Sequence, residues 1–599
     1  MRKDRRTMPG VLILCSPTSR IMFFLGGHRR RCDRLLPTRS RVRALLADRS
    51  LTSERSILPA ALRTHRSVGG SSILSVHCNK WGLTMNKTHL CFTCSWLLLP
   101  VALIGTTSAS SQQEPVAYSG VTESRLMFQE NCAVCHGGEL EGAAQGTPLR
   151  GDLVHGESMA DVVASIANGY VDSGMPSWDD IFSPVQVQGL AMYVLETRAN
   201  VGYVTSNYDA PLSIPEGEFE TELHSFRLET LVDDLDPLPF SLAPLPDGSL
   251  LVTEKTKGVR VISPDGDKSE LVRGTPQAYD DIYQMESRID IERGMGWLFD
   301  ILLHPNYQEN GWIYLYHGHR CEDCTDLSRE RGRPVSMNRL VRGRVDNGEW
   351  IDEEVIWQAD LEHYSFAGDV GAGGRVVFDS RGHVYFSVGA KGGMQGVQDL
   401  STPWGKIHRI NDDGTIPQDN PFVGRDDVYQ SIYTYGHRSP QGLEFDRTGG
   451  ELWGSEHGPR GGDEINLLLP GRNYGWPLYS LGLDYDGTPV EYGKDLGVEF
   501  ELSDIEQPVV DLTPSPAVSS FIISDSDQFP EWKGDYLVGS LKARSLFRVE
   551  IEDNQFVARE TLFEGIGRVR DIEQAFNGDI YLLFEHNAGG KVARLVPVE

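Results

Sequence analysis

Short apolar runs separated by polar turns dominate the second half of the chain. From residue 223 onward, runs rich in Val, Ile, Leu, Tyr and Phe alternate with turns that contain Gly, Asp and Pro, with almost no helical periodicity. This pattern predicts β-strands. A turn followed by an apolar strand recurs in six segments: LPDGSLLVTE, NGWIYLYHG, SRGHVYFSVG, TGGELWGSEHG, WKGDYLVGSL and NGDIYLLFE.

The spacing of these segments predicts the architecture. Six units over residues 223–599 average about 60 residues each, a length that suits four-stranded propeller blades. Residues 112–205 show helical spacing instead, in segments such as MADVVASIANGY and VQVQGLAMYVLETRA. The polar residues 206–222, with two prolines, are expected to be a linker. The sequence therefore predicts a multidomain protein, with a small all-α domain followed by an all-β six-bladed β-propeller.

The N-terminal region differs from the rest in charge. Residues 1–84 carry 17 Lys and Arg against 4 Asp and Glu, whereas residues 85–599 carry a net charge of −42. The leader 1–84 has no periodicity that would build a core, so we expect it not to belong to the mature protein, although a targeting or nucleic-acid-binding arm would share its composition. From Met85, MNKTH, an apolar run and the small residues TTSASS have the three parts of a secretory signal, which we assign to residues 85–111.

Export and the acidic balance restrict the function. The signal predicts a periplasmic or otherwise exported protein. The acidic charge of the mature chain argues against nucleic acid or an anionic membrane surface as a partner. The apolar run of the signal is short for a membrane span, so no stable span is expected.

The stretch NCAVCHGGEL, residues 131–140, carries the clearest chemistry. Cys132 and Cys135 have the spacing of thioether attachment to the two vinyl groups of haem c, and His136 directly behind them is placed to ligate the iron. A disulfide or half of a zinc site would use the same cysteine spacing. A zinc site would need a second pair of ligands, and none occurs before residue 200. We therefore predict haem c at this position.

A low-spin haem that carries electrons needs a sixth ligand, commonly Met. Met159 and Met192 lie in segments of helical spacing, whereas Met175 lies in the loop DSGMPSWDD, where Pro176 disfavours a helix. We predict Met175 as the ligand, with Met159 and Met192 as alternatives. With its opening helix, TPLRG turn, Met loop and closing helix, the segment 112–205 resembles a small class I cytochrome c.

Of the nine cysteines, five lie in the leader and signal. The last pair, Cys321 and Cys324 in RCEDCTD, lacks a following His and is not a second haem site. In an oxidising compartment the simplest expectation is a local disulfide, with a redox-active pair as the alternative.

The predicted propeller resembles the glucose/sorbosone dehydrogenase family of soluble quinoproteins over residues 238–599. Matching segments run in family order; among them are PFSLAPLPDGSLLVTE, YGHRSPQGLEFD, EHGPRGGDEINLLLPGRNYGWP, GSLKARSLFRV and GRVRDI. The resemblance implies pyrroloquinoline quinone as cofactor and a sugar or alcohol as substrate. It further implies a downstream electron acceptor such as a cytochrome or an oxidase.

The resemblance also implies binding residues. The cations that match the family's quinone-carboxylate site are Arg438, Lys542, Arg568 and Arg570. A tricarboxylate requires fixed cations, and the planar guanidinium suits a carboxylate best. The resemblance implies calcium ligands at the carbonyls of Gly458 and Pro459 and, for a second calcium, at Asp463, Glu464 and Tyr474. Oxygen donors suit a hard cation.

The chain departs from the family at the chemistry. Gly371 stands where the family's proton-accepting histidine is expected, and Ala390 stands where its supporting acid is expected. Met295 takes the place of a polar residue near the cofactor. Asp369 and His363 are the nearest candidate replacements, although a loop Asp is more often a turn former and a loop His is more often simply solvated.

Two interpretations follow. In the first, the protein is an exported quinoprotein oxidoreductase whose propeller passes electrons to its own haem, which raises the effective concentration of the acceptor. In the second, the propeller has lost sugar oxidation and acts as a haem-bearing binding or electron-relay module. We favour the first, because a haem domain joined to a propeller needs an electron source.

Overall fold

The computed structural model describes residues 119–201, 210–283 and 293–598. The expected leader and signal lie outside these residues. The helices and strands below belong to one compact unit, Thr107–Glu599. Within the described ranges, every helix falls short of the length and apolar character that a membrane span requires.

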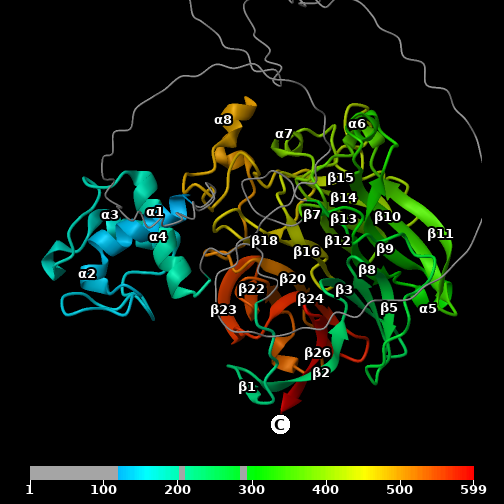
Figure 1. The fold of residues 1–599 in the computed structure, drawn as a ribbon, viewed down its shortest axis with the longest axis horizontal. Helices are drawn as coiled ribbons and strands as arrows, with labels where there is room; N and C mark the ends of the chain where they lie inside the picture. The colour runs from blue at the N-terminus through cyan, green and yellow to red at the C-terminus, as the bar shows by residue number, and fades with distance from the viewer. Residues whose placement is uncertain (1–118, 202–209, 284–292, 599) are drawn as a thin grey trace, which may run out of the picture. The chain divides into compact units, whose positions relative to one another are not determined.

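The segment before the predicted linker is helical (Figure 1, blue to cyan). It contains α1 (Ser119–Asn131), α2 (Ala133–His136), α3 (Met159–Asn168), the 3₁₀ turn η2 (Val171–Ser173) and α4 (Pro184–Arg198). Ser158 and Ser183 begin α3 and α4 with capping boxes, in which each serine side chain accepts from the backbone N–H three residues on. Phe128, Val162 and Leu195 pack in the core that these helices enclose.

The remaining chain forms the blades of a propeller (Figure 1, green to red). The strands of the first three blades are β3 (Pro239–Pro244), β4 (Leu250–Glu254), β5 (Gly258–Ile262); β8 (Leu298–Leu303), β9 (Ile313–Cys321), β10 (Val335–Asp346), β11 (Glu349–Gln358); and β12 (Gly373–Phe378), β13 (His383–Val388), β14 (Lys406–Asn411), β15 (Ile432–Tyr435). Those of the next two are β16 (Pro440–Asp446), β17 (Glu451–Glu456), β18 (Glu464–Leu467), β19 (Val510–Asp511); and β20 (Val518–Ile523), β21 (Tyr536–Ser540), β22 (Leu546–Glu552), β23 (Gln555–Phe563). The last blade combines β24 (Arg568–Gln574), β25 (Ile580–Glu585) and β26 (Gly590–Val598) with β2 (Ser225–Leu235) and β1 (Glu218–Glu220).

The first strands of the six blades form a closed ring. β3 contacts β8, β8 contacts β12, and the series continues through β16, β20 and β24 back to β3. The predicted six-bladed β-propeller is confirmed. The ring is completed by β2, which pairs antiparallel with β26 from Ser225 opposite Val598. β1 lies within the segment 206–222 that was expected to be a linker, and it pairs with β2.

The recurring turn of the sequence has one backbone cause. Each of the six segments places a glycine just before the second strand of its blade, and each adopts a positive φ that side chains other than glycine disfavour. These glycines are Gly248 (φ 88°), Gly311 (68°), Gly382 (85°), Gly450 (77°), Gly534 (88°) and Gly578 (85°).

Short elements connect the blades. They are the two-stranded ladder β6 (Ile282–Tyr283) and β7 (Arg293–Gly294), the helices α5 (Tyr307–Asn310), α6 (Asp326–Arg331), α7 (Met394–Val397) and α8 (Tyr492–Leu496), and the 3₁₀ turns η3 (Leu361–His363), η4 (Leu502–Asp504) and η5 (Pro530–Trp532).

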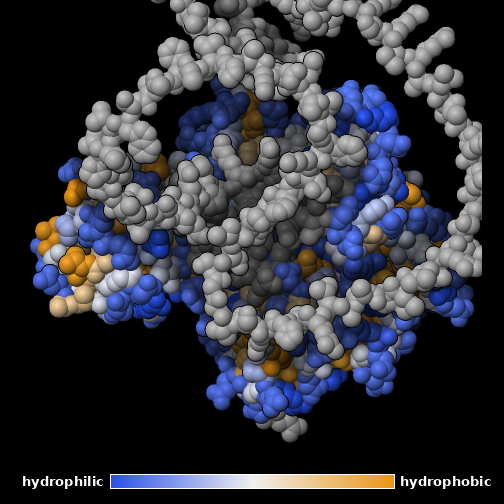
Figure 2. All heavy atoms as spheres, in the orientation of Figure 1, coloured by the Kyte–Doolittle hydropathy of each residue, from blue (hydrophilic) through white to orange (hydrophobic). Residues whose placement is uncertain are grey.

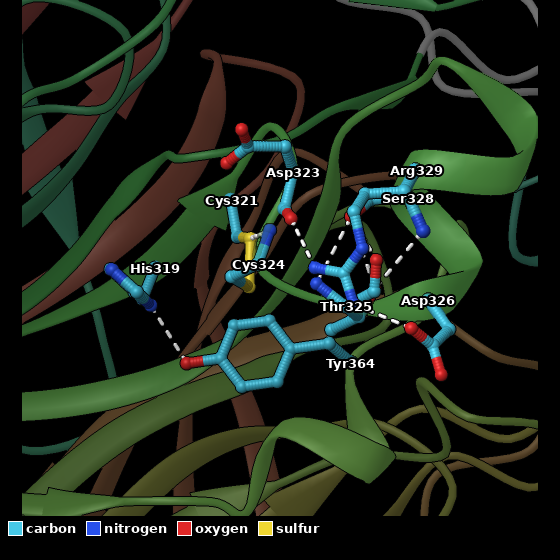
Figure 3. Close-up of a disulfide and its surroundings, with 9 residues drawn as sticks. All are labelled: His319, Cys321, Asp323, Cys324, Thr325, Asp326, Ser328, Arg329 and Tyr364. Carbon is cyan, nitrogen blue, oxygen red and sulfur yellow. Dashed lines mark hydrogen bonds and ion pairs between the residues drawn. A yellow bond between two sulfur atoms is a disulfide. The ribbon is translucent and has the colours of Figure 1, made fainter.

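A disulfide joins Cys321, the last residue of β9, to Cys324 (Figure 3), so the prediction of a local disulfide is confirmed. Directly behind it, the Thr325 hydroxyl accepts a hydrogen bond from the backbone of Ser328 and begins α6. Arg329 of α6 returns a hydrogen bond to the Asp323 carbonyl. The disulfide therefore fixes the loop between β9 and α6.

Candidate functional site

The predicted haem-attachment residues lie at a break between two helices. Cys132 follows α1 and precedes α2, which contains Cys135 and ends at His136. Both cysteines are free thiols. The Nδ1–H of His136 donates to the Thr147 carbonyl at 2.9 Å, which fixes the tautomer and leaves Nε2 as the lone-pair nitrogen. Two free thiols and an oriented imidazole are the donor set that a covalently attached haem requires.

The surface of this helical domain also fits a haem. Among its large apolar side chains, Val134, Val154 and Val171 are each more than two-thirds exposed, and Figure 2 shows hydrophobic residues gathered over this domain. Val134 lies between the two cysteines, and Val171 lies four residues before Met175. An apolar porphyrin held at these positions would cover side chains that water now contacts.

The three candidate methionines differ in their surroundings. Met159 packs at the edge of the helical core, and Met192 in α4 is fully buried. Met175 is half-buried and lies in a loop that two backbone hydrogen bonds between residues 170 and 175 hold in place. A thioether in an ordered loop, outside any helix, is the one available to approach the iron. Met175 stays our prediction for the sixth ligand.

Two of the predicted quinone-binding cations lie on the first strand of the last blade. The Nε of Arg568 and the Nε of Arg570 each donate to the Glu585 carboxylate at 2.8 Å, and all three residues are buried. The two guanidinium groups hold the pKa of Glu585 far below its usual range despite its burial. Arg570 also donates to the side-chain oxygen of Gln441 at 3.0 Å.

Lys255 is a third cation at this position, and sequence analysis missed it. It follows β4 and is 4% exposed, with its ammonium over the rings of Phe240 and Trp297. Burial, followed by the charges of Arg570 and Arg568, lowers the pKa of Lys255 to about 7. Its only sequence signal is a lysine directly after the strand segment LLVTE.

These residues leave a surplus of positive charge. Two cationic side chains, Lys255 and Arg570, act on one carboxylate, that of Glu585, which also accepts from Arg568. A protein that buries cations without matching anions destabilises its own fold unless an anionic ligand binds there. The surplus therefore fits a polycarboxylate ligand such as pyrroloquinoline quinone.

Arg438 and Lys542 approach from other blades. Arg438 donates to the Tyr485 hydroxyl at 2.8 Å and to the His457 carbonyl at 3.2 Å, and its guanidinium lies over the Trp476 ring. The Lys542 ammonium has no hydrogen-bond or ion-pair partner in the part of the chain that the structure describes, and burial lowers its pKa. Arg438 and Arg570 both act electrostatically on His457, which places the two cations around one centre.

Next to these cations is a pocket under the loop between β17 and β18. Glu456 anchors one wall, because its carboxylate accepts from His437 at 2.9 Å and from the backbone N–H of Ser439 at 3.0 Å. Asp463 anchors the loop by accepting from the backbone of Gly458 and Val518. The residues that line the pocket are Arg438, Glu456, His457, Gly458, Gly462, Glu464, Tyr474, Trp476, Tyr479 and Ser480.

The predicted calcium ligands Gly458, Glu464 and Tyr474 thus share this pocket. Burial and the neighbouring Glu456 raise the pKa of Glu464 to about 8, and two carboxylates that repel one another suit a bound cation. Pro459 and Asp463 belong to the same loop without lining the pocket, and Asp463 already accepts two backbone hydrogen bonds. No group of three or more His, Cys, Asp or Glu side chains arranged for a metal ion occurs in the described residues.

Comparison with known families agrees with this geometry. The model of the Glucose / Sorbosone dehydrogenase family matches residues 237–594. The chain belongs to the glucose/sorbosone dehydrogenase family. The model of the Cytochrome C oxidase, cbb3-type, subunit III family matches residues 121–194, so the helical domain is a cytochrome c domain. A dehydrogenase-family propeller joined to a cytochrome c domain is the composition of an oxidoreductase.

Individual relatives match the propeller. The aldose sugar dehydrogenase YliI of Escherichia coli is 30% identical over 61% of this chain and 91% of its own length. The quinoprotein glucose dehydrogenase B of Acinetobacter calcoaceticus is 27% identical over 48% of this chain and 60% of its own. The crystal structure of the soluble E. coli aldose sugar dehydrogenase in its apo-form superposes with a TM-score of 0.53 at 29% identity, covering 62% of this chain and all of that one.

The structure shows space at the position where this family's base is expected. A Cβ atom added to Gly371 would meet no atom within 4 Å. Ala390 is half-buried beside an apolar cluster of Val397, Trp476 and Val490. Met295 is 1% exposed. The cations predicted to bind the cofactor are thus present in this propeller, whereas the position at which a base is expected is a glycine with open space around it.

Neither candidate replacement has the surroundings of a base. Asp369 is 3% exposed, and its carboxylate accepts from the Lys391 ammonium, the Ser336 hydroxyl and the backbone N–H groups of Gly296 and Trp297. This saturated ion pair favours a structural role, because every lone pair is already used. His363 packs against the rings of Trp404 and Tyr429, which favours a packing role.

Proposed function

We propose that this chain is an exported quinoprotein oxidoreductase that oxidises a sugar or alcohol in its propeller and passes the electrons to its own haem. The observation that carries the proposal is the positive charge of Lys255 and Arg570 around the single carboxylate of Glu585, in a propeller of the glucose/sorbosone dehydrogenase family. The names of the relatives, an aldose sugar dehydrogenase and a quinoprotein glucose dehydrogenase, support this class of substrate and cofactor.

In this proposal the cofactor's carboxylates are held by the predicted quinone-binding cations of the propeller. Glu585 fixes the directions of the Arg568 and Arg570 guanidinium groups before the ligand arrives. Arg438 and Lys542 contribute charge from two further blades. Gly458 and Glu464 line the pocket where calcium would bind. Bound pyrroloquinoline quinone supplies the capacity to accept two electrons from a hydroxyl-bearing carbon.

The haem side of the proposal rests on Cys132, Cys135 and His136. A haem held by these residues would accept one electron at a time, so each two-electron oxidation would need two successive transfers, and a downstream cytochrome or oxidase would take up each electron. Held in the same chain, the acceptor is present at a high effective concentration.

The vacated base position limits the rate of this reaction. With Gly371 and Ala390 in place of a histidine and its acid, the substrate's hydroxyl proton has no positioned acceptor among the family positions. A positioned base typically contributes about 10²–10⁴ in rate. We therefore expect low activity on simple aldoses. The same observation supports the second candidate function, a haem-bearing binding or electron-relay module without sugar oxidation.

Titration of residues 112–599 with pyrroloquinoline quinone in calcium tests the proposal. We expect saturable binding that Arg570→Ala weakens at least tenfold, because a charge-assisted hydrogen bond contributes about 1.5–3 kcal/mol. Arg472→Ala removes a partly exposed arginine of an ion pair with Glu506 and serves as the control with unchanged affinity. Failure of the wild-type protein to bind the quinone would refute the dehydrogenase function and support the relay module.

A further inference from the structure

Helix α4 of the cytochrome domain carries a buried charged residue that lies outside the domain's own hydrophobic core. Leu190, Ala191, Val194 and Leu195 of this helix pack in the helical core. Glu196 and Met192, one turn apart on another face, do not belong to that core, yet they are 3% and 0% exposed. A helix buried on two faces has a second partner.

The second partner is the loop of the propeller between β17 and β18. Arg460 of this loop donates from Nε to Oε1 of Glu196 at 3.1 Å and from Nη2 to Oε2 at 2.8 Å. The Arg460 side chain is fully buried. This parallel pair of hydrogen bonds has the fork geometry that fixes both direction and distance. Two backbone hydrogen bonds between Arg460 and Leu483 hold the loop in turn.

Gly461 brings the two backbones close together. Its φ is +81°, and a Cβ atom at this position would lie 2.4 Å from the Met192 Cε. A side chain at residue 461 is therefore disfavoured both by backbone conformation and by the Met192 thioether. The contact combines a buried ion pair with a close apolar approach, which is the composition of a specific interface.

The contacted loop is also the one that lines the cofactor pocket. Gly458 and Gly462, on either side of Arg460, form part of the pocket wall. The charge of Glu196 also acts on Lys542, one of the predicted quinone-binding cations, as does that of Asp463. Helix α4 thus contacts the site from outside the propeller.

We propose that Glu196 and Arg460, the docking pair, hold the cytochrome domain on the pocket loop and so set the route by which electrons leave the propeller. The inference rests on the proposed function, since it takes the haem as the acceptor of those electrons. A buried ion pair adds little net stability but specifies geometry. A docked haem domain receives each of the two electrons without a diffusive search by the linker-tethered domain.

Hydrogen exchange on the full-length haem protein tests the docking. Glu196→Gln removes one negative charge and leaves Arg460 buried without its partner. We expect exchange in the pocket loop and in α4 to accelerate at least tenfold. Glu130→Gln removes the same charge from an exposed position of α1 and is expected to change neither segment. Unchanged exchange in Glu196→Gln, with the haem spectrum intact, would overturn the proposal.

A charge exchange keeps the test decisive if the single variant disturbs the cytochrome domain. Glu196→Arg combined with Arg460→Glu returns opposite charges to the same two positions, so slow exchange is expected to recover relative to Glu196→Arg alone. Equal exchange in the single and the double variant would show that this pairing does not dock the domains.

A kinetic measurement separates this inference from the proposed function. With chemically reduced pyrroloquinoline quinone, in calcium, at a concentration that saturates haem reduction in each protein, we expect haem reduction to be at least tenfold slower in Glu196→Gln than in the wild type. Equally fast haem reduction in the variant would overturn the docking route. If hydrogen exchange shows docking but the wild-type haem is not reduced at all, the proposed function would be refuted and the interface would still be supported.

Discussion

Lys255 is a buried cation whose protonation responds to an anion bound beside it. Its pKa of about 7 in the protein is low because of burial and the neighbouring arginines. A carboxylate ligand stabilises the ammonium and raises this pKa, so the complex binds more protons than the free protein above pH 7. We predict that affinity for pyrroloquinoline quinone falls as the pH rises from about 7 toward 10.

Calorimetry in buffers of different ionisation enthalpy measures this effect directly. At pH 8 we expect proton uptake on quinone binding, and we expect Lys255→Met to abolish it. The sign follows from linkage, since a ligand that favours the protonated form takes up protons between the two pKa values. Proton release on binding, or uptake of the same size in Lys255→Met, would show that Lys255 does not interact electrostatically with the bound ligand.

Gly371 and Ala390 stand where the family's base and its supporting acid are expected. Replacing Gly371 by His and Ala390 by Asp restores the family pair, and a Cβ at residue 371 meets no atom within 4 Å. We predict an increase of at least tenfold in aldose oxidation with an artificial acceptor, because a positioned base contributes about 10²–10⁴. Wild-type activity that already equals that of ordinary family members would show that the base has another location, and Asp369→Asn then tests the Lys391-paired carboxylate.

Met175 provides a prediction for the haem. Replacing it by Ala removes the predicted thioether ligand, which should change the visible spectrum of the iron and lower its reduction potential, since thioether ligation raises the potential. Met159→Ala is the matched control and should leave both unchanged. An unaltered spectrum in Met175→Ala would transfer the assignment to Met159 or Met192.

At the scale of elements, the strands were predictable and their closure was not. Each blade's second strand follows a glycine turn with a positive φ, a signal confined to about ten residues of sequence. β2 pairs with β26, although the two strands lie at opposite ends of the propeller's sequence, so no local pattern encodes this pairing. Lys255 and the docking pair could not be predicted for the same reason, because their partners lie on other blades or in another domain. The CxxCH spacing and the disulfide could be predicted because they are local in the sequence.

The closing strand carries an element-scale prediction. Phe226 of β2 is fully buried among Trp532, Phe529 and Leu595. Phe226→Ala should lower the free energy of unfolding by about 3–5 kcal/mol, the usual cost of removing a buried aromatic ring. Phe576→Ala, at a residue 71% exposed, should change it little. Urea unfolding of both variants checks this, and equal stability would mean that β2 does not close the ring.

The whole molecule is strongly acidic, yet its propeller buries a cluster of cations. The same chain joins this propeller to a cytochrome c domain. We expect electrons to pass from a quinone bound in the propeller to the haem of the same chain. Rapid mixing of the oxidised haem protein, in calcium, with chemically reduced pyrroloquinoline quinone tests it without knowledge of the substrate. We predict haem reduction whose rate saturates with quinone concentration and falls at least tenfold in Arg570→Ala at subsaturating quinone. A haem that stays oxidised, or one reduced equally fast in Arg570→Ala, would contradict it.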